Sequence, residues 1–191
     1  MTPIEARYIV NGLWVAWLVY WMIAARGTKR TIYRDSPAFQ IPQILLMLVG
    51  FYLLSTKSVR SGLLSESFVP MEPAYMTVGT ALTFAGLGFA VWARVHLGRN
   101  WSGGIRIALD QELIRSGPYA RIRHPIYSGM LAAAFGTAIV VGCWYALLGA
   151  GLATLGFWLK ARREEALLAR EFGEKFEERR RHAGFFFPRF F

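Results

Sequence analysis

The sequence predicts an all-α integral membrane protein with about five transmembrane helices. Hydrophobic residues make up 54% of its 191 residues and aromatic residues 15%, which is a composition typical of membrane proteins. Long uncharged runs alternate with loops that hold most of the 22 basic residues. The net charge of +10 is therefore interpreted as membrane topology, and nucleic acid is not an expected partner.

Four apolar runs are predicted to hold the five spans. Residues 8–25, 41–56 and 74–95 are each long enough to cross a bilayer once, and Pro42 is expected at the start of the second helix. Residues 126–159 contain no charge over 34 positions, which is too long for one span and sufficient for two short ones. A helical hairpin that reverses at residues 142–144 is expected, with its legs paired through glycines and alanines.

Charge in the loops predicts the orientation of the chain. The loops at residues 26–34 and 94–123 carry a basic excess and should be cytoplasmic, whereas residues 57–73 carry none and should lie outside. No signal peptide is recognised, so the first run is expected to remain in the protein. We expect one membrane domain over residues 1–191, in which residues 1–73 supply two spans and residues 74–191 supply the third span, the hairpin and the functional core.

A dense cluster of polar residues precedes the hairpin. Gly117 and Pro118 predict a turn, and Pro125 after His124 predicts a helix start. A positive helix end next to Arg123 would suit an anion. The alternative is a basic loop that anchors the helix at the cytoplasmic face.

A second polar cluster lies at the far end of the hairpin. Because the two legs are antiparallel, Glu164 and Glu165 should return to the level of His124. Lys160 is four residues before Glu164, so the two could also form an ordinary surface pair.

The remaining features have modest interpretations. Arg94 and His96 fit either an interfacial belt or a ligand role. The aromatic residues 185–191 suggest an interfacial anchor. Leu168, Phe172 and Phe176 indicate an amphipathic helix that continues from the hairpin into the cytoplasm. The lone Cys143 and three scattered histidines form no metal-ligand pattern.

The spacing of these motifs resembles the isoprenylcysteine carboxyl methyltransferase family. The resemblance rests on four blocks between residues 92 and 188, and related phospholipid N-methyltransferases share parts of it; the first two spans vary in this family. The blocks are Gly117-Pro118-Tyr119, Arg123-His124-Pro125-x-Tyr127-x-Gly129, Glu164-Glu165 and Phe172-Gly173-Glu174.

The resemblance implies an S-adenosylmethionine-dependent membrane methyltransferase with a cytoplasmic cofactor pocket in its carboxyl-terminal half. Arg123 and Glu164 are the implied catalytic residues, and Arg123 would orient the acceptor or serve the cofactor. Lys160 stands where eukaryotic members have an arginine, and it lacks the planar fork that binds carboxylates. The implied cofactor-binding residues are Gly117, Pro118, Tyr119, His124, Pro125, Tyr127, Glu164 and Glu165.

The expected acceptor is lipophilic, for example a prenylated carboxylate or a membrane lipid, and reaches the site laterally past Gly86 and Gly88. Phospholipid or other lipid methylation is an alternative. An NADPH-dependent reductase of the sterol-reductase type is another, although those proteins continue Arg-His-Pro with Asn-Tyr rather than Ile126-Tyr127. A non-catalytic membrane subunit or carrier is a third, and the absence of charge within the spans weighs against an ion path.

Overall fold

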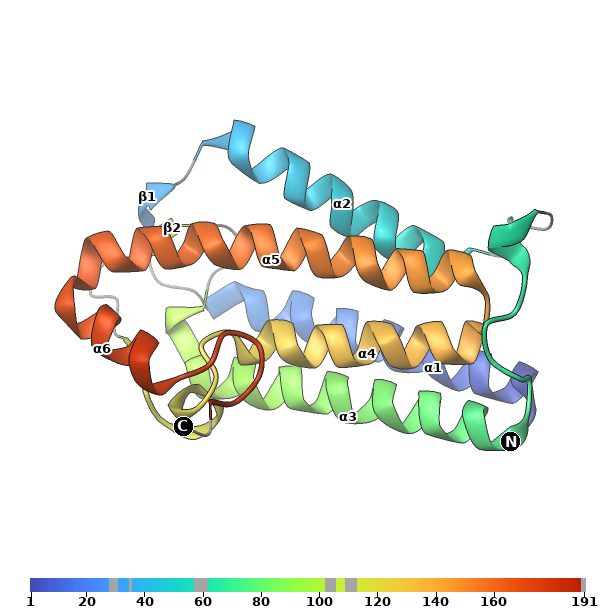
Figure 1. The fold of residues 1–191 in the computed structure, drawn as a ribbon. Coiled ribbons are helices and arrows are strands. Elements are labelled where there is room, and N and C mark those ends of the chain that lie inside the picture. The colour runs from blue at the N-terminus through green and yellow to red at the C-terminus, as the bar shows by residue number, and fades with distance from the viewer. Residues whose placement is uncertain (28–30, 35, 57–61, 102–105, 109–112, 190–191) are drawn as a thin grey trace.

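The computed structural model is a bundle of helices that lie side by side (Figure 1). The structure describes residues 1–27, 31–34, 36–56, 62–101, 106–108 and 113–189. Short 3-10 turns and one antiparallel ribbon, β1 (Thr31–Arg34) with β2 (Arg106–Ala108), connect the helices. The helices are α1 (Pro3–Ala24), α2 (Pro37–Ser55), α3 (Pro73–Leu97), α4 (Pro125–Val141), α5 (Trp144–Phe172) and α6 (Glu174–His182).

The five long helices coincide with the five predicted spans, and α4 and α5 form the expected hairpin. Two helices, at residues 37–55 and 73–100, are long and apolar enough to cross a membrane, and α4 is a shorter apolar helix. Gly173, with a φ of +51°, ends α5, so Phe176 lies on the separate helix α6 and not on a continuation of the hairpin leg.

The second helix begins earlier than predicted. The Ser36 side chain caps α2 by accepting a hydrogen bond from the Ala38 N–H, and Pro37 occupies the first turn. A serine cap followed by proline is a stronger start signal than Pro42 alone. Pro42 is therefore inside the helix, which corrects the prediction that it would begin it.

Glycines join the helices into two tight pairs, α3 with α4 and α2 with α5. Gly86 packs backbone to backbone on Gly129, and Gly79 packs in the same way on Gly136. Gly149 meets Gly50 across the other pair. The prediction that the hairpin legs pair with each other through these glycines is wrong, because each leg presents its small residues to a different helix.

This packing also corrects the expected acceptor route. A Cβ atom added at Gly86 would lie 2.6 Å from the Ala133 nitrogen and the Gly129 oxygen, so no acyl chain can pass there. Gly88 faces open space, with no atom within 4 Å of an added Cβ. Close backbone contact, not access, explains the glycine at position 86.

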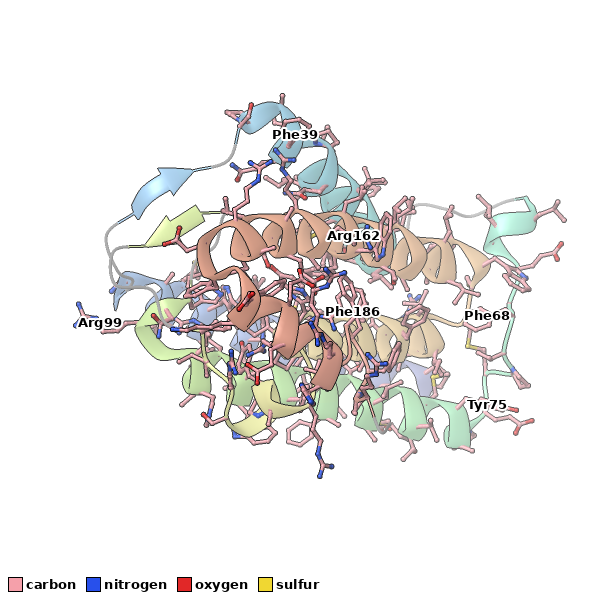
Figure 2. All side chains as sticks on the ribbon, turned by 60° about the vertical axis from the view of Figure 1, so that its left-hand side comes forward. Phe39, Phe68, Tyr75, Arg99, Arg162 and Phe186 are labelled. Carbon is pink, nitrogen blue, oxygen red and sulfur yellow. The ribbon has the colours of Figure 1, made fainter. Side chains whose placement is uncertain are left out.

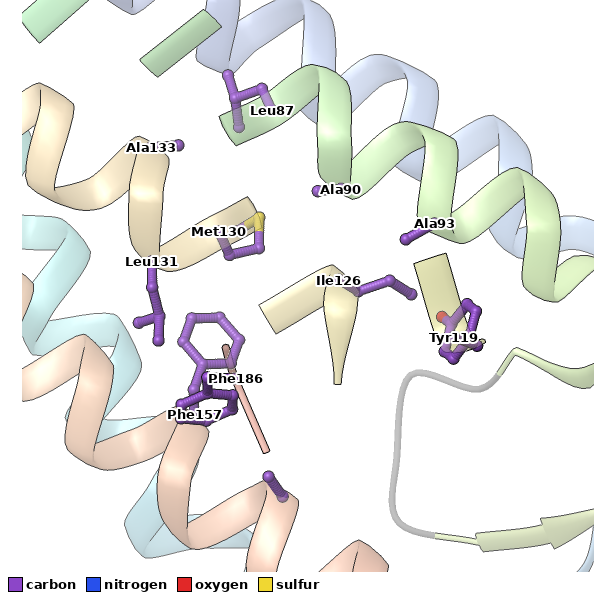
Figure 3. Close-up of a cluster of buried hydrophobic side chains, with 11 residues drawn as sticks. Leu87, Ala90, Ala93, Tyr119, Ile126, Met130, Leu131, Ala133, Phe157 and Phe186 are labelled. Atoms are coloured by element: carbon purple, nitrogen blue, oxygen red, sulfur yellow. The ribbon is translucent and has the colours of Figure 1, made fainter. Parts of the chain in front are cut away.

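The main hydrophobic core lies toward one end of the bundle. Figure 3 shows Ala90 and Ala93 of α3 facing Ile126 and Met130 of α4, with Phe157 of α5 below them. Tyr119 and Phe186 close this cluster from outside the long helices.

The two ends of the bundle carry different elements. The ribbon, α6 and the carboxyl terminus gather at one end, and the amino terminus lies at the other (Figure 1). Figure 2 places Arg99 at the first end and Phe68 and Tyr75 at the second. The first end, where α4 begins, holds the predicted functional residues.

Candidate functional site

The Gly117-Pro118-Tyr119 motif forms a 3-10 turn (Gly117–Ala120) against the end of α3. Gly117 has a φ of +58°, and an added Cβ would lie 2.6 Å from the His96 ring. His96 Nε2 is also 2.9 Å from Ser116 Oγ. Glycine is required here both for its backbone conformation and for the close approach of the histidine.

His124 lies at the centre of the site. It occupies the cap position of α4, with Pro125 in the first turn as predicted, and it is only 8% exposed. Its ring stacks on Tyr127, with centroids 5.6 Å apart and planes 4° from parallel. Its Nε2 atom lies 3.1 Å from Glu165 Oε1.

The two glutamates of α5 bind different partners from α4 and the turn before it. Arg123 Nε donates to Glu165 Oε1 over 2.5 Å. The Tyr127 hydroxyl donates to Glu164 Oε1 over 2.7 Å, and Lys160 Nζ lies 4.0 Å from the same atom. Antiparallel packing of the hairpin therefore brings the acidic pair to the Arg-His-Pro turn, as the sequence suggested.

The charge of Glu165 is stabilised by its neighbours. Burial raises the pKa of this carboxyl, but the hydrogen bonds from His124 and Arg123 outweigh burial and hold the pKa below its ordinary value. Glu165 is consequently ionised at neutral pH, and it fixes both basic side chains.

Residues 183–187, the carboxyl-terminal strap, cover this cluster. Arg123 N donates to Gly184 O (2.8 Å) and His124 N donates to Phe185 O (3.2 Å). Ser128 Oγ donates to Phe186 O over 2.6 Å, and the Arg123 guanidinium donates to the carbonyl oxygen of Ala183. The Phe185 ring centroid is 5.0 Å from that of His124. Phe185 and Phe186 are thus part of the site, which corrects their interpretation as a peripheral anchor.

A further arginine, Arg179, lies beside Tyr119. The Arg179 Cζ atom is 5.9 Å from the centroid of the Tyr119 ring, and Arg179 donates to the Ile114 carbonyl. Burial raises the pKa of Tyr119 and lowers that of Arg179 to about 10.

Arg94 is not part of an interfacial belt. It is buried and donates to Gly98 O (2.7 Å) and Ala24 O (2.5 Å) at the carboxyl ends of α3 and α1. The Trp101 ring lies over its guanidinium at 4.5 Å. The belt interpretation failed because one sequence does not reveal that two helix ends converge on this side chain.

Hydrogen bonds and ring contacts join Arg123, His124, Tyr127, Glu164 and Glu165 into one cluster. The Gly117 turn lies beside it, because Tyr119 belongs to the same hydrophobic cluster as Tyr127, Phe185 and Phe186. In the described ranges, no three His, Cys, Asp or Glu side chains form a metal-binding group.

A model of the phospholipid methyltransferase family matches residues 74–175. The match covers more than half of the chain and contains α3, the turn, the Arg-His-Pro motif and both glutamates. The chain belongs to the phospholipid methyltransferase family.

The fold of this family member is similar to that of a eukaryotic intramembrane Ras methyltransferase, isoprenylcysteine carboxyl methyltransferase. The TM-score is 0.51 at 20% sequence identity, over 82% of this chain and 54% of that one. The chain therefore corresponds to about half the length of that enzyme. No curated protein matches the sequence. The resemblance expected from the motifs is confirmed, since the family and the fold are both those of membrane methyltransferases.

Proposed function

We propose that this protein transfers a methyl group from S-adenosylmethionine to a lipophilic acceptor at the end of the bundle where α4 begins. The observation that carries the proposal is the convergence of Glu164 and Glu165 on Arg123, His124 and Tyr127. Every one of these residues lies within the segment that matches the methyltransferase family.

The side chains in this cluster fit the chemistry of the proposed methyl donor, which supplies an electrophilic methyl group on a sulfonium cation. Glu164 offers a carboxylate whose side chain is 21% exposed, and it can accept hydrogen bonds from ribose hydroxyl or ammonium groups. Tyr127 and Phe157, whose ring centroids are 5.1 Å apart, offer aromatic faces that attract a cation.

The residues of the chain would act mainly by binding and orientation. Glu165 holds His124 and Arg123, while Phe185 and Phe186 shield that pair from water. Transfer to a carboxylate requires no proton removal, so positioning and exclusion of water are sufficient. Arg123 and Glu164 are the proposed catalytic residues, and the turn at Gly117, Pro118 and Tyr119 is the proposed wall of the donor pocket.

Methylation of a phospholipid amine is a second candidate, favoured by the family to which the chain belongs. An ammonium group must lose a proton before it can attack. Glu164 could receive that proton at Oε1, where the Tyr127 hydroxyl now donates. The two candidates differ in whether Glu164 acts as a base or only as a hydrogen-bond acceptor.

We also propose that five helices cross the membrane with the site at the cytoplasmic face. Exposed basic residues support this orientation. Arg99 lies at the site end in Figure 2, Arg162 lies in the half of α5 that leads to this end, and Arg181 lies on α6, which is at this end in Figure 1. The apolar surfaces of α1 and α2 are extensively exposed, which suits contact with lipid.

The test is methyl transfer by the protein purified in detergent. Methyl-labelled S-adenosylmethionine should label either a prenylcysteine or phosphatidylethanolamine, and Glu164→Gln should abolish labelling. If the Glu164→Gln variant loses labelling of phosphatidylethanolamine and high pH partly restores it, Glu164 acts as a base in the wild-type protein. The absence of labelling of any lipid by the wild-type protein would contradict the proposal.

A further inference from the structure

Residues 62–72, the outer cap, lie over the end of the bundle opposite the candidate site. Figure 1 shows this segment, in green, running past the point where α4 and α5 reverse. It begins with a 3-10 turn (Leu63–Ser65) and ends where α3 begins. Phe68 N donates to Gly142 O (2.8 Å), and Trp144 N donates to Glu66 O (3.2 Å). The cap thus pairs with backbone groups on both sides of the reversal.

The first leg of the hairpin is short for a bilayer. Helix α4 has 17 residues, so its length is about 25 Å, whereas the hydrocarbon core of a bilayer is about 30 Å thick. In the proposed orientation, on which this step rests, α4 begins at the cytoplasmic boundary of that core. The reversal at Gly142 then lies about 5 Å inside the opposite boundary. Backbone groups at such a depth need partners within the protein, and the hydrogen bonds of the outer cap supply them.

The 3-10 turn of the outer cap also satisfies its own polar groups. The Ser65 amide and hydroxyl both donate to Gly62 O, over 2.9 and 2.7 Å, and Glu66 N donates to Leu63 O (3.2 Å). The hydrophobic side chains of the turn nevertheless point outward, since Leu63 is 79% exposed and Leu64 is exposed as well. Exposed leucines on a turn whose polar groups are paired suit hydrocarbon better than water.

An open crevice of about 460 Å³ lies between this turn and the first turns of α5. Its described lining residues are apolar except for Glu66, and they are Leu63, Leu64, Trp144, Leu147 and Leu148. Trp144 and Leu148 are exposed, and they lie on the same face of α5 as the exposed Leu155 and Trp158. The crevice therefore continues an apolar helix surface that suits lipid.

We propose that the outer cap is inserted into the non-cytoplasmic leaflet of the membrane and that lipid acyl chains fill the crevice. The occupant is bilayer lipid at the end of the protein remote from the candidate site, and it takes no part in methyl transfer. Leu63 and Leu64 lie at the level of the upper acyl chains. Glu66 is exposed, and its carboxylate limits the depth because it stays among the headgroups. The cap thereby fills the thickness that the short hairpin leaves.

The test is quenching of a fluorophore attached to a single cysteine in a Cys143→Ser background. Leu63→Cys places the label on the outer cap. Leu48→Cys, at another exposed leucine on α2, is the lipid control, and Arg181→Cys on α6 is the water control. Each protein is reconstituted in phosphatidylcholine vesicles. The quencher is either a lipid that carries it on an acyl chain, or iodide present on both sides of the membrane.

The lipid quencher should remove most of the fluorescence at position 63, as at position 48, whereas iodide should remove little of it. Quenching at position 63 by iodide alone, as at position 181, would show that the cap lies in water and would overturn the proposal. Protection from both quenchers would also overturn it, because protein would then cover the crevice. The label at position 48 reports separately on the crossing of α2. Since no methyl transfer is measured, failure of the proposed function would leave the result at position 63 unchanged.

Discussion

Arg123 Nε lies 2.5 Å from Glu165 Oε1, in a pair whose side chains are only 12% and 10% exposed. The pair joins the turn before α4 to the end of α5, which are 42 residues apart in the sequence. Because the same guanidinium also donates to the carboxyl-terminal strap, one side chain holds three segments of the site together.

Breaking this pair should destabilise the protein strongly. Arg123→Met removes one of the two partners of the buried Glu165 carboxylate and the bond of the guanidinium to the strap, so we expect a loss of about 3 kcal/mol and a lower melting temperature in detergent. Arg115→Met, which breaks an exposed pair with Glu178, should lower the melting temperature much less, because solvent screens that pair. Equal effects of the two substitutions would show that the buried pair is not a structural link.

Acid should release the carboxyl-terminal strap. The folded state lowers the pKa of Glu165, so its stabilising contribution is present above the unfolded pKa and is lost as the pH falls through the folded value. The protection factors of the amides of Arg123, His124 and Gly184, which join the strap to the turn, should fall below about pH 4. In Glu165→Gln these protection factors, corrected for the intrinsic pH dependence of exchange, should already be low at pH 7 and should change little with pH. A strap that stays protected in Glu165→Gln would contradict this link.

Gly86 and Gly88 provide a matched pair on one helix. Gly86→Leu should disrupt the contact of α3 with α4, at a cost of about 3 kcal/mol or more, and should lower expression and activity together. Gly88→Leu faces open space and should leave stability unchanged. Thermal unfolding of both variants checks this, and a stable Gly86→Leu protein would mean that the helices are farther apart than described.

The proposed topology predicts which cysteines are accessible. In a Cys143→Ser background, Arg181→Cys should react with an impermeant reagent only from the cytoplasmic side, and Ser67→Cys only from outside. Position 30, in a loop expected to be cytoplasmic, lies outside the described residues, so Arg181 is the better reporter. Labelling of both cysteines from the same side would contradict the proposal that α3, α4 and α5, which lie between these two positions, each cross the membrane once.

Much of the fold can be predicted from a single sequence, because the patterns that predict its helices and turns lie within short stretches of the chain. The uncharged runs, the proline starts at Pro37 and Pro125, and the reversal near Gly142 depend on neighbouring residues. The facing of Glu164 and Glu165 with His124 was also predictable, since a hairpin of known leg length returns the chain to its starting level.

Other features depend on contacts between distant segments and left no local signal. The glycines at 129 and 149 indicate close packing, but their spacing does not say which helix they contact. Arg94 and Arg179 look like ordinary members of basic stretches. The burial of Arg94 follows from the meeting of the ends of α1 and α3, and that of Arg179 from the packing of α6 on Ile114 and Tyr119. Phe185 and Phe186 resemble an anchor until the hydrogen bonds of the strap to residues 121–128 are seen.

Equilibrium binding of S-adenosylmethionine and of NADPH to the same purified protein tests the central claim most directly. The proposed function predicts saturable binding of S-adenosylmethionine by the wild-type protein and none of NADPH. Glu164→Gln should bind S-adenosylmethionine at least about 10-fold more weakly while remaining folded. Saturable NADPH binding, or undiminished S-adenosylmethionine binding by folded Glu164→Gln and Glu165→Gln variants, would contradict the account of the site.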